Sequence, residues 1–406
     1  MIQSNTLKFW YATLALCIGS VMVFSNLYIT QPLLPVLRDA FAIDSLEAAL
    51  SLSVATLSMG VCLLFFGPLS DAIGRRVVIL TTLLLLCLVT AATAFAADYT
   101  DLLILRCIQG ALIAGLPAAA LAYMGEEFDS KALLLAVGIY IGANTLGGVA
   151  GRLISGLVAA EWGWRSSFLF LGAFDLVCLF LVFRLMPASQ RFVPRPFRFQ
   201  QMISDLKLHL CNPMILAACF IGGLNFFIFV NQYSYITFVL ADEPYGLSSD
   251  WLGLFFLTYL TGTLAASISG RLVKNRSQTG AMGVGIVIFM AGTLLTLTPN
   301  LIVIIAGFFI NALGFFFTHS LAAGWVTGHA QWARASATSL YLMFYYAGAT
   351  LGGFYLEPFW RWAEWEGVVI GSLFVLSLTF SISVWLGRRK PLFGNNNSSV
   401  IETMQD

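Results

Sequence analysis

The chain has 406 residues, of which 59% are hydrophobic and only 10% are charged. Soluble domains carry about a quarter of charged residues, so this composition excludes a single soluble fold. Lys and Arg (21) nearly balance Asp and Glu (20), which leaves a net charge of +1 and none of the basic excess that nucleic-acid binding requires.

Long apolar runs follow one another along the whole chain. A run of about 18 or more apolar residues can cross the hydrocarbon layer of a bilayer as a helix, which satisfies its own backbone groups. We count twelve such runs, at residues 9–37, 47–68, 77–97, 102–125, 132–160, 166–186, 213–240, 251–272, 280–298, 301–325, 335–359 and 367–387. The sequence therefore predicts an all-α membrane protein with twelve transmembrane helices.

The longest polar interval, residues 187–212, separates the sixth run from the seventh. YIGANTLGG at 140–148 returns in the second half as YYAGATLGG at 345–353. Internal repeats of this kind are typical of transporters. We therefore predict two pseudo-symmetric six-helix bundles, 1–186 and 213–406, joined by a cytoplasmic linker at 187–212, with a short cytoplasmic tail after the second.

The distribution of Lys and Arg predicts the orientation. If the N-terminus is cytoplasmic, sixteen of the 21 basic residues lie on the cytoplasmic side, Arg38, Arg165 and Arg361 lie on the opposite side, and Arg106 and Arg152 lie within spans. Positive charge gathers on the cytoplasmic side of membrane proteins. We therefore expect both termini in the cytoplasm.

The short loop between the second and third predicted spans contains the segment GPLSDAIGRR. Its glycines permit a tight turn and close helix approach, and its Asp and Arg residues can form an ion pair at the membrane face. Because such a pair can open and close, we predict a gate formed by Gly67, Asp71, Gly74, Arg75 and Arg76. The alternative is a loop that only places positive charge in the cytoplasm.

This loop resembles the signature loop of the major facilitator superfamily, in which an Asp and an Arg at the positions of Asp71 and Arg75 form a cytoplasmic latch. LRCIQG at 105–110 is similar to the fourth-helix motif of the drug:proton antiporter-1 branch. GRLISGL at 151–157, TYLTGT at 258–263 and SLYLMFYYAG at 339–348 look like the YnfM-type inner-membrane transport proteins of that superfamily. The resemblance covers nearly the whole chain. It implies the superfamily's fold, a bacterial inner-membrane location and efflux of a small organic compound.

The fifth span resembles the glycine-rich antiporter motif of the same branch through Gly138, Gly142, Gly147, Gly148 and Gly151. It has Ala143 and Asn144 where that motif has a Gly-Pro pair, which weakens the argument for antiport. Small residues at this spacing also let helices pack closely whatever the direction of transport. Both interpretations remain open.

Ionisable groups inside membrane spans are costly and usually functional. We predict that coupling depends on Arg106, Arg152, Asp175 and His319, with Arg106 facing the central cavity and either Asp175 or His319 carrying the proton. The alternatives are that Arg106 extends to the outer interface, that Asp175 is a structural partner of Arg152, and that His319 is a satisfied core residue.

Substrate contacts in a two-bundle transporter come from polar and aromatic side chains near the midplane. The candidates for substrate binding are Asn26, Tyr28, Gln31, Gln109, Asn144, Asn225, Asn231, Asn311, Tyr341 and Tyr345, with Gln232 beside them. Most aromatic residues in such a chain pack against lipid or other helices, so any one Tyr has that interpretation as well.

We expect no enzyme, because the sequence has no HExxH or phosphate-loop motif and no paired intramembrane aspartates. The seven cysteines lack the spacing of metal ligands, so we expect no metal site. We also expect no cofactor, with the proton gradient as the energy source. The expected partners are a small-molecule substrate, protons and the lipid bilayer, with no nucleic acid, and the protein is expected to be a monomer.

The predicted function is secondary active transport by alternating access, as proton-coupled export of a drug or metabolite. The first alternative is proton-coupled import of a small metabolite, and the second is a membrane sensor that transports nothing. The few charges expected in the cavity weakly favour a neutral or anionic solute, since Arg106 would repel a cation.

Overall fold

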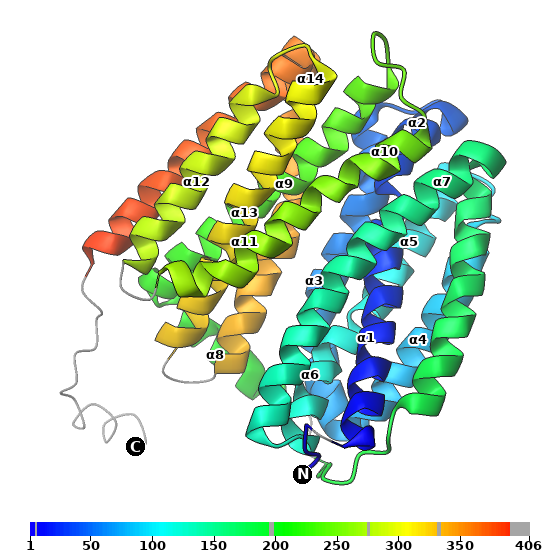
Figure 1. Cartoon of the computed structure of the whole chain (residues 1–406), viewed down its shortest axis with the longest axis vertical. Coiled ribbons are helices and arrows are strands. Elements are labelled where there is room, and N and C mark those ends of the chain that lie inside the picture. Colours follow the sequence, from blue (N-terminus) through cyan, green and yellow to red (C-terminus); the bar gives the residue numbers. More distant parts are fainter. Residues whose placement is uncertain (5, 195–198, 274–276, 331–333, 390–406) are drawn as a thin grey trace.

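The computed structural model describes residues 1–389 except residue 5 and residues 195–198, 274–276 and 331–333. Part of the predicted linker and nearly all of the predicted C-terminal tail therefore lie outside the described residues. Within the described residues, the regular secondary structure is helical, apart from one isolated bridge between Ile2 and Phe128. The helices lie side by side along the long axis of the molecule (Figure 1).

The first half of the molecule consists of the helices before the linker. They are α1 (Leu7–Tyr28), η1 (Gln31–Leu33), α2 (Leu34–Phe41), α3 (Ser45–Ile73), α4 (Arg75–Thr93), α5 (Tyr99–Ile113), α6 (Gly115–Glu127) and α7 (Ser130–Leu185). We call the end of the molecule where α1 begins the terminal end, and the opposite end the far end (Figure 1).

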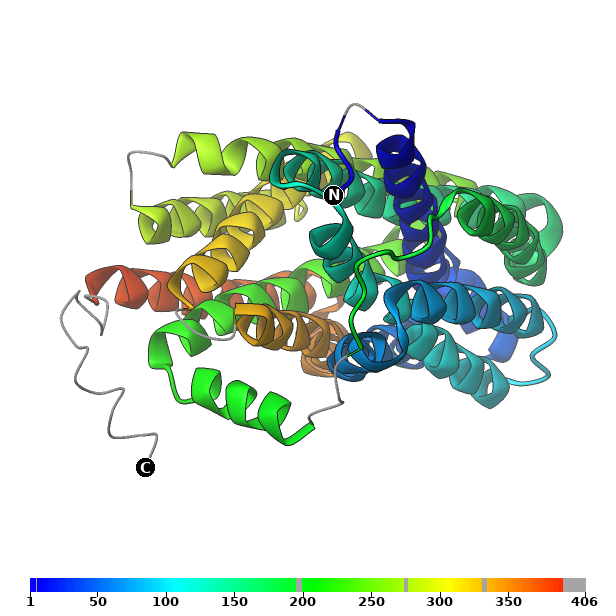
Figure 2. The same cartoon turned by 90° about the horizontal axis from the view of Figure 1, so that it is seen from below.

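The second half follows the linker. Its helices are α9 (Pro213–Ala241), α10 (Ser249–Phe255), η2 (Phe256–Thr258), α11 (Tyr259–Leu272), α12 (Gln278–Leu295), α13 (Leu301–His329) and α14 (Arg334–Arg388). The linker itself contains α8 (Phe199–Leu210), a helix that the sequence analysis did not predict, which packs on α9 and α14. Seen from the terminal end, the helices of the two halves group on opposite sides of the molecule (Figure 2).

Nine helical stretches among the described residues are long and apolar enough to cross a membrane. Two of them, α7 and α14, each contain two crossings, because the backbone leaves the helical region at Gly163 and at Ala363–Glu364 and the chain turns back there (Figure 1). The path α10–η2–α11 is broken into shorter helices by its 3₁₀ turn, and it makes one more passage between the two ends (Figure 1). The twelve predicted runs follow this same path.

Capping side chains mark where several helices begin. The Asp44 carboxylate accepts a hydrogen bond from the Glu47 backbone, and the Glu47 side chain bonds the Asp44 backbone in return, which forms a capping box at the start of α3. Asp98 and Asp129 cap α5 and α7 through one such bond each. Gly74, with φ of 111°, provides the turn from α3 to α4 that a residue with a side chain would strain to make. Local sequence thus sets these helix boundaries.

The repeated segments occupy equivalent positions in the two halves. A Cβ at Gly147 in α7 would lie 2.7 Å from the Cα of Val21 in α1, and a Cβ at Gly352 in α14 would lie 2.1 Å from the carbonyl oxygen of Phe227 in α9. In each half, therefore, a glycine of the repeat lets the fifth crossing touch the backbone of the first. By contrast, Gly138 and Gly142 have nothing within 4 Å of an added Cβ. Only the later part of the glycine-rich segment packs on α1.

Large apolar side chains cover the outer surface of the bundle. Leu134, Phe180 and Phe374 are 79%, 62% and 65% exposed, and many similar residues surround them. A soluble protein rarely exposes such a continuous apolar surface, whereas a bilayer requires one. The surface fits a chain that is embedded in lipid.

Candidate functional site

A chain of hydrogen bonds buried in the first half links a carboxylate to a guanidinium. The side-chain amide nitrogen of Asn26 donates to both oxygens of Asp175, at 3.0 and 2.9 Å, and the Thr90 hydroxyl donates to the Asn26 oxygen at 2.5 Å. Gln109 donates to the Thr90 hydroxyl at 3.0 Å and accepts from Arg106 at 2.9 Å. All five side chains are buried. This network joins α1, α4, α5 and α7, and it brings together two predicted substrate residues and two predicted coupling residues.

Arg106 is surrounded by acceptors. Besides Gln109, its guanidinium donates to the carbonyl oxygens of Ser51 at 2.8 Å, Asn26 at 2.9 Å and Leu27 at 2.7 Å. It is completely buried, so it does not extend to the outer interface. Because these bonds go to α1 and α3, Arg106 ties three helices of the first half together.

Arg152 does not pair with Asp175, so the suggested structural pair is wrong. Arg152 instead lies at the seam between the halves, where its Nε donates to Gln31 at 2.8 Å. Its guanidinium carbon lies 3.9, 4.9 and 4.4 Å from the ring centres of Tyr28, Phe256 and Tyr259. The sequence does not show which helix face each of these side chains occupies. In the structure Asp175 contacts Asn26, whereas Arg152 contacts Gln31.

His319 lies in an aromatic cluster of the second half. Its Nδ1 is 2.8 Å from the Tyr341 hydroxyl, and its ring centre is 4.6 Å from that of Tyr345 and 5.9 Å from that of Phe315. The imidazole is partly exposed, whereas Tyr341 and Tyr345 are buried. The histidine thus has a hydrogen-bond partner within the second half.

A second buried network occupies the second half. Asn311 in α13 donates to the Gln232 oxygen in α9 at 2.6 Å and to the Thr293 hydroxyl in α12 at 3.2 Å. Gln232 also donates to Thr293 at 3.2 Å. The structure thus places Asn311, a predicted substrate residue, in helix packing.

Three other predicted substrate residues also join helices. Asn144 accepts from Ser20 between α7 and α1. Asn225 accepts from Thr379 at 3.0 Å, and Asn231 donates to the carbonyl oxygen of Ala349 at 2.9 Å. The contacts of Asn225 and Asn231 hold α9 against the two crossings of α14, within the second half.

The predicted gate residues form an ion-pair cluster at the terminal end. Arg75 pairs with Asp71 and, at 2.8 Å, with Glu126 of α6, and it donates to the Ser70 hydroxyl at 2.6 Å. Glu126 was not among the predicted residues, because its position 51 residues from Arg75 carries no local signal. All of these partners belong to the first half.

The other gate residues have separate neighbours. Arg76 donates to the carbonyl oxygen of Met186 at 3.2 Å, which holds the end of α7 against the start of α4. Gly67 has nothing within 4 Å of an added Cβ, so no helix among the described residues packs closely on it in this conformation. The same holds for Gly125 in α6 and Gly328 in α13, also toward the terminal end.

Ion pairs join the two halves at the far end. Arg38, after α1, holds Asp242, at the end of α9, through hydrogen bonds of 2.9 and 2.8 Å. Asp44, before α3, lies 3.2 Å from Arg361 of α14. Nearer the middle, the Thr350 hydroxyl of α14 donates to the Ser53 carbonyl oxygen of α3 at 2.9 Å, and Ser249 of α10 donates to the Gly156 carbonyl oxygen of α7 at 3.1 Å. The halves are therefore latched at the far end, whereas the gate cluster at the terminal end stays within one half.

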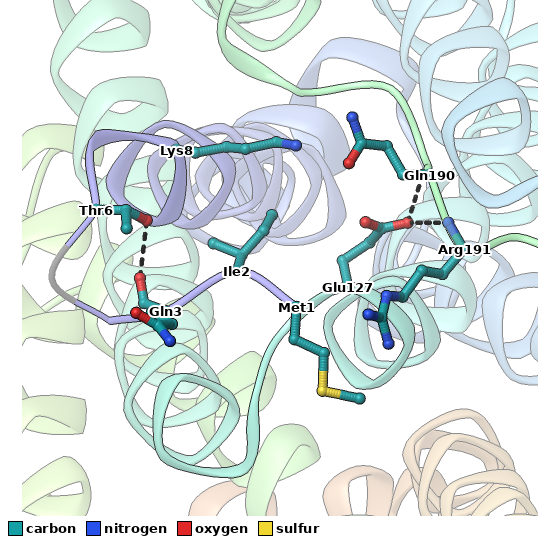
Figure 3. Close-up of a pocket in the computed structure, with 8 residues that line it drawn as sticks. All are labelled: Met1, Ile2, Gln3, Thr6, Lys8, Glu127, Gln190 and Arg191. Carbon is teal, nitrogen blue, oxygen red and sulfur yellow. Dashed lines mark hydrogen bonds between the residues drawn. The ribbon is translucent and has the colours of Figure 1, made fainter.

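A hollow of about 250 Å³ opens beside the N-terminus (Figure 3). Ile2 pairs with the loop between α6 and α7, since its backbone nitrogen donates to Glu127 at 2.7 Å and its carbonyl accepts from Asp129 at 3.1 Å. The Glu127 carboxylate accepts from the backbone nitrogens of Gln190 and Arg191 at 2.6 and 2.9 Å (Figure 3). This hollow lies at the surface of the terminal end, away from the buried networks.

Several side chains of the buried clusters were not predicted from the sequence, among them Thr90, Phe256 and Tyr259. Thr90 completes the Asp175 network, while Phe256 and Tyr259 contact Arg152 from the other half. A threonine or an aromatic residue in an apolar span is too common to be a signal. Only the fold brings these residues near the charged groups.

These helices, the repeat that relates the halves, and the buried charges define a membrane transporter. The chain belongs to the Major Facilitator Superfamily, whose family model matches residues 16–353. It is 33% identical to the inner membrane transport protein YnfM of Escherichia coli, over 94% of this chain and 91% of that protein. It is 24% identical to the multidrug resistance protein MdtM of the same organism, over 71% of this chain and 70% of that protein.

A solved structure of a bacterial homologue of the lysosomal transporter Spinster, described as inward-facing and occupied, superposes with a TM-score of 0.75. It is 16% identical and covers 95% of this chain and 98% of that one, so it supports the fold alone. The predicted superfamily fold is thus confirmed. Because the relatives are named as transporters, the prediction that the chain is not an enzyme also holds.

Proposed function

We propose that this transporter exports a small organic solute in exchange for protons, by alternating access and with the proton gradient as its only source of energy. The observation that carries this proposal is the environment of Asp175. Its carboxylate is completely buried, and its hydrogen bonds come from the neutral Asn26 amide. A buried carboxylate with neutral partners is a group that can take up and release a proton as its surroundings change.

Protonation of Asp175 would change the hydrogen-bond network of the first half. The ionised carboxylate accepts both bonds from Asn26, whereas a protonated carboxyl must place a hydrogen on one of those oxygens. Asn26 also accepts from Thr90, which leads through Gln109 to Arg106. A proton at Asp175 would therefore rearrange bonds that tie α1 to α4, α5 and α7.

We place both termini in the cytoplasm, because the basic residues gather at the terminal end. The structure then corresponds to the inward-facing state, since the latches Arg38–Asp242 and Asp44–Arg361 close the periplasmic side. In the outward-facing state we expect the terminal ends of the halves to approach. Gly67 and the Asp71–Arg75 pair would then receive contacts from the second half, where the described residues make none with them here.

Different observations favour the two possible directions of transport, export and import. Export is supported by the name of MdtM, a multidrug resistance protein, although the identity is 24%. Import by proton symport is the alternative, and it would use the same fold and the same Asp175. The departure of Ala143 and Asn144 from the antiporter motif is the observation that favours it.

The test uses inside-out membrane vesicles with an acidified lumen and a pH-sensitive dye. A panel of drugs, sugars, amino acids and aromatic acids is added one at a time. We expect at least one compound to make the lumen more alkaline, and Asp175→Asn to abolish that response while vesicles without the protein never show it. Uptake of a panel compound by whole cells without lumen alkalinisation would instead support import, and the absence of both would contradict proton-coupled transport.

A further inference from the structure

Arg152 is a buried cation without a carboxylate partner. It is 1% exposed, and none of the ion pairs found among the described residues includes it. Its Nε donates to Gln31 and its Nη1 to the carbonyl oxygen of Gly148 at 2.7 Å, but Nη2 has no hydrogen-bond partner. A buried charge is strongly disfavoured unless something compensates it. The positive charge of Arg152 therefore has no anionic partner among the described residues.

Arg106, the other arginine buried within a span, has a full set of hydrogen bonds. Arg106 is equally buried, but its three nitrogens make four hydrogen bonds to carbonyl and amide oxygens. Nothing further is needed to hold it in place. The unpartnered nitrogen of Arg152 is thus not a general property of arginine in this bundle.

Three aromatic rings hold the Arg152 guanidinium in position. Tyr28 belongs to the first half, whereas Phe256 and Tyr259 belong to the second, and all three ring centres lie within 5 Å of the guanidinium carbon. Rings attract a cation weakly compared with a carboxylate, so they orient the charge without neutralising it. Gly148 completes the arrangement, because a Cβ there would lie 3.3 Å from Nη1.

A second unpaired donor lies at the same place. The Tyr259 hydroxyl is buried near the Gln31 amide but makes no hydrogen bond of normal geometry. An arginine nitrogen and a phenol hydroxyl together are suited to the two oxygens of a carboxylate, which accepts several charge-assisted hydrogen bonds. The rings of Tyr28, Phe256 and Tyr259 make the surroundings of this pair of donors apolar.

We infer that Arg152 and Tyr259 bind the carboxylate of the transported solute, which is an organic anion with an apolar body. Binding at this seam draws on both halves, because Arg152 and Tyr28 come from one half and Tyr259 from the other. The inference rests on the proposed transport function, but it concerns binding and needs no proton gradient. It replaces Arg106 with Arg152 as the charge that selects the solute.

The test compares benzoate with its neutral isostere benzamide and with inorganic phosphate, at constant ionic strength, by thermal unfolding of the purified full-length protein in detergent. We expect benzoate to raise Tm more than either of the others. A benzoate shift no larger than the benzamide shift overturns the inference. An equal shift with phosphate also overturns it, because the site would then bind any oxyanion.

Variants assign the effect to the site. We expect Arg152→Gln to lose the difference between benzoate and benzamide, and Tyr259→Phe to reduce it. The control is Arg165→Gln, in the other crossing of α7. Its guanidinium stacks on Trp164 at 4.2 Å from the ring centre, and the variant should keep the full difference. If Arg152→Gln does not fold, Arg152→Lys replaces it and should keep a weakened preference for benzoate.

Two results separate this inference from the proposed function. A benzoate preference that depends on Arg152, found together with no proton-coupled transport, would contradict the proposed function and leave the anion site standing. Proton-coupled export of neutral compounds only, with a benzoate shift unchanged in Arg152→Gln and Tyr259→Phe, would support the function and overturn the anion site.

Discussion

Each half of the molecule buries two amides and a threonine in mutual hydrogen bonds, but only the first half adds charges to them. Asn26, Thr90 and Gln109 in the first half correspond to Gln232, Thr293 and Asn311 in the second, on helices that follow one another in the same order. The first network continues to Asp175 and Arg106, whereas the second has Phe308 one turn before Asn311, as Arg106 stands one turn before Gln109.

The two halves use one scaffold for two purposes. A neutral amide–threonine cluster satisfies its polar groups in lipid and fixes helix packing. It does so without the free-energy cost of burying a charge. A cluster that includes a carboxylate and a guanidinium can change its protonation state. We therefore expect the first half to carry the proton and the second half to act mainly as its packed counterpart.

The largest effect is expected for Asp175→Asn. The amide keeps the size of the side chain but cannot take up a proton, so substrate-driven alkalinisation of the vesicle lumen should be lost, while Asn225→Asp in the second half should not restore it. The measurement is the pH-dye assay described above. An unchanged lumen response in Asp175→Asn would show that another group carries the proton. It would also contradict the distinct role of the first half.

Arg106→Leu should destabilise the folded protein by about 3–5 kcal/mol, because the four buried carbonyl and amide oxygens that accept from it stay behind unpaired. Asn311→Leu, in the neutral network, should cost less, about 1–3 kcal/mol. Thermal unfolding in detergent with reference to the wild type measures both. Equal losses in the two variants would show that charge adds nothing to the stability of the first network.

The two repeated glycines should respond alike. Gly147→Ala and Gly352→Ala each place a methyl group within 3 Å of the neighbouring helix backbone, so each should cost about 1–3 kcal/mol by forcing the helices apart. Gly142→Ala, on the same helix as Gly147, is the control and should be neutral. A destabilising Gly142→Ala, or a tolerated Gly352→Ala, would contradict the equivalence of the two repeats.

The smallest effect is expected where the halves meet at the far end. The Arg38 guanidinium holds the pKa of the Asp242 carboxyl below its usual value through a hydrogen bond. The pair therefore stabilises the far-end contact at neutral pH, and this contribution is lost only as the pH falls through that lowered pKa. Asp242→Asn should weaken the contact by about 0.2–1 kcal/mol, as for an exposed ion pair.

Labels placed on the two far-end loops report this contact by the distance between them. Asp242→Asn should increase the open fraction at pH 7, and the wild type should show the same increase only at strongly acidic pH. An opening of the wild type between pH 5 and 7 would assign the pH response of the far end to another group.

The sequence contained enough information for the fold but not for the site. Hydrophobic run length predicts each crossing locally, and even the reversals within α7 and α14 fall between runs that were separate in the sequence. The contacts of Arg152 could not be predicted in this way. Its ring partners Phe256 and Tyr259 lie about a hundred residues away in the other half, and which helix faces meet depends on packing of the whole bundle.

Partner choice inside the first half shows the same limit. Asp175 and Arg152 were candidates for each other because opposite charges in lipid attract, but an amide from α1 reaches the carboxylate instead. The identities of the buried polar residues were evident from the sequence, whereas their connections required the angle at which each helix faces its neighbours.

The docking of the first residues also bears on how the protein can be handled. Ile2 forms backbone hydrogen bonds on both sides with the loop between α6 and α7, next to the hollow of Figure 3. A polypeptide fused ahead of Met1 begins one residue before these backbone hydrogen bonds, so we expect it to strain them. An affinity tag or fluorescent reporter at the N-terminus therefore acts directly on the contact between Ile2 and the α6–α7 loop.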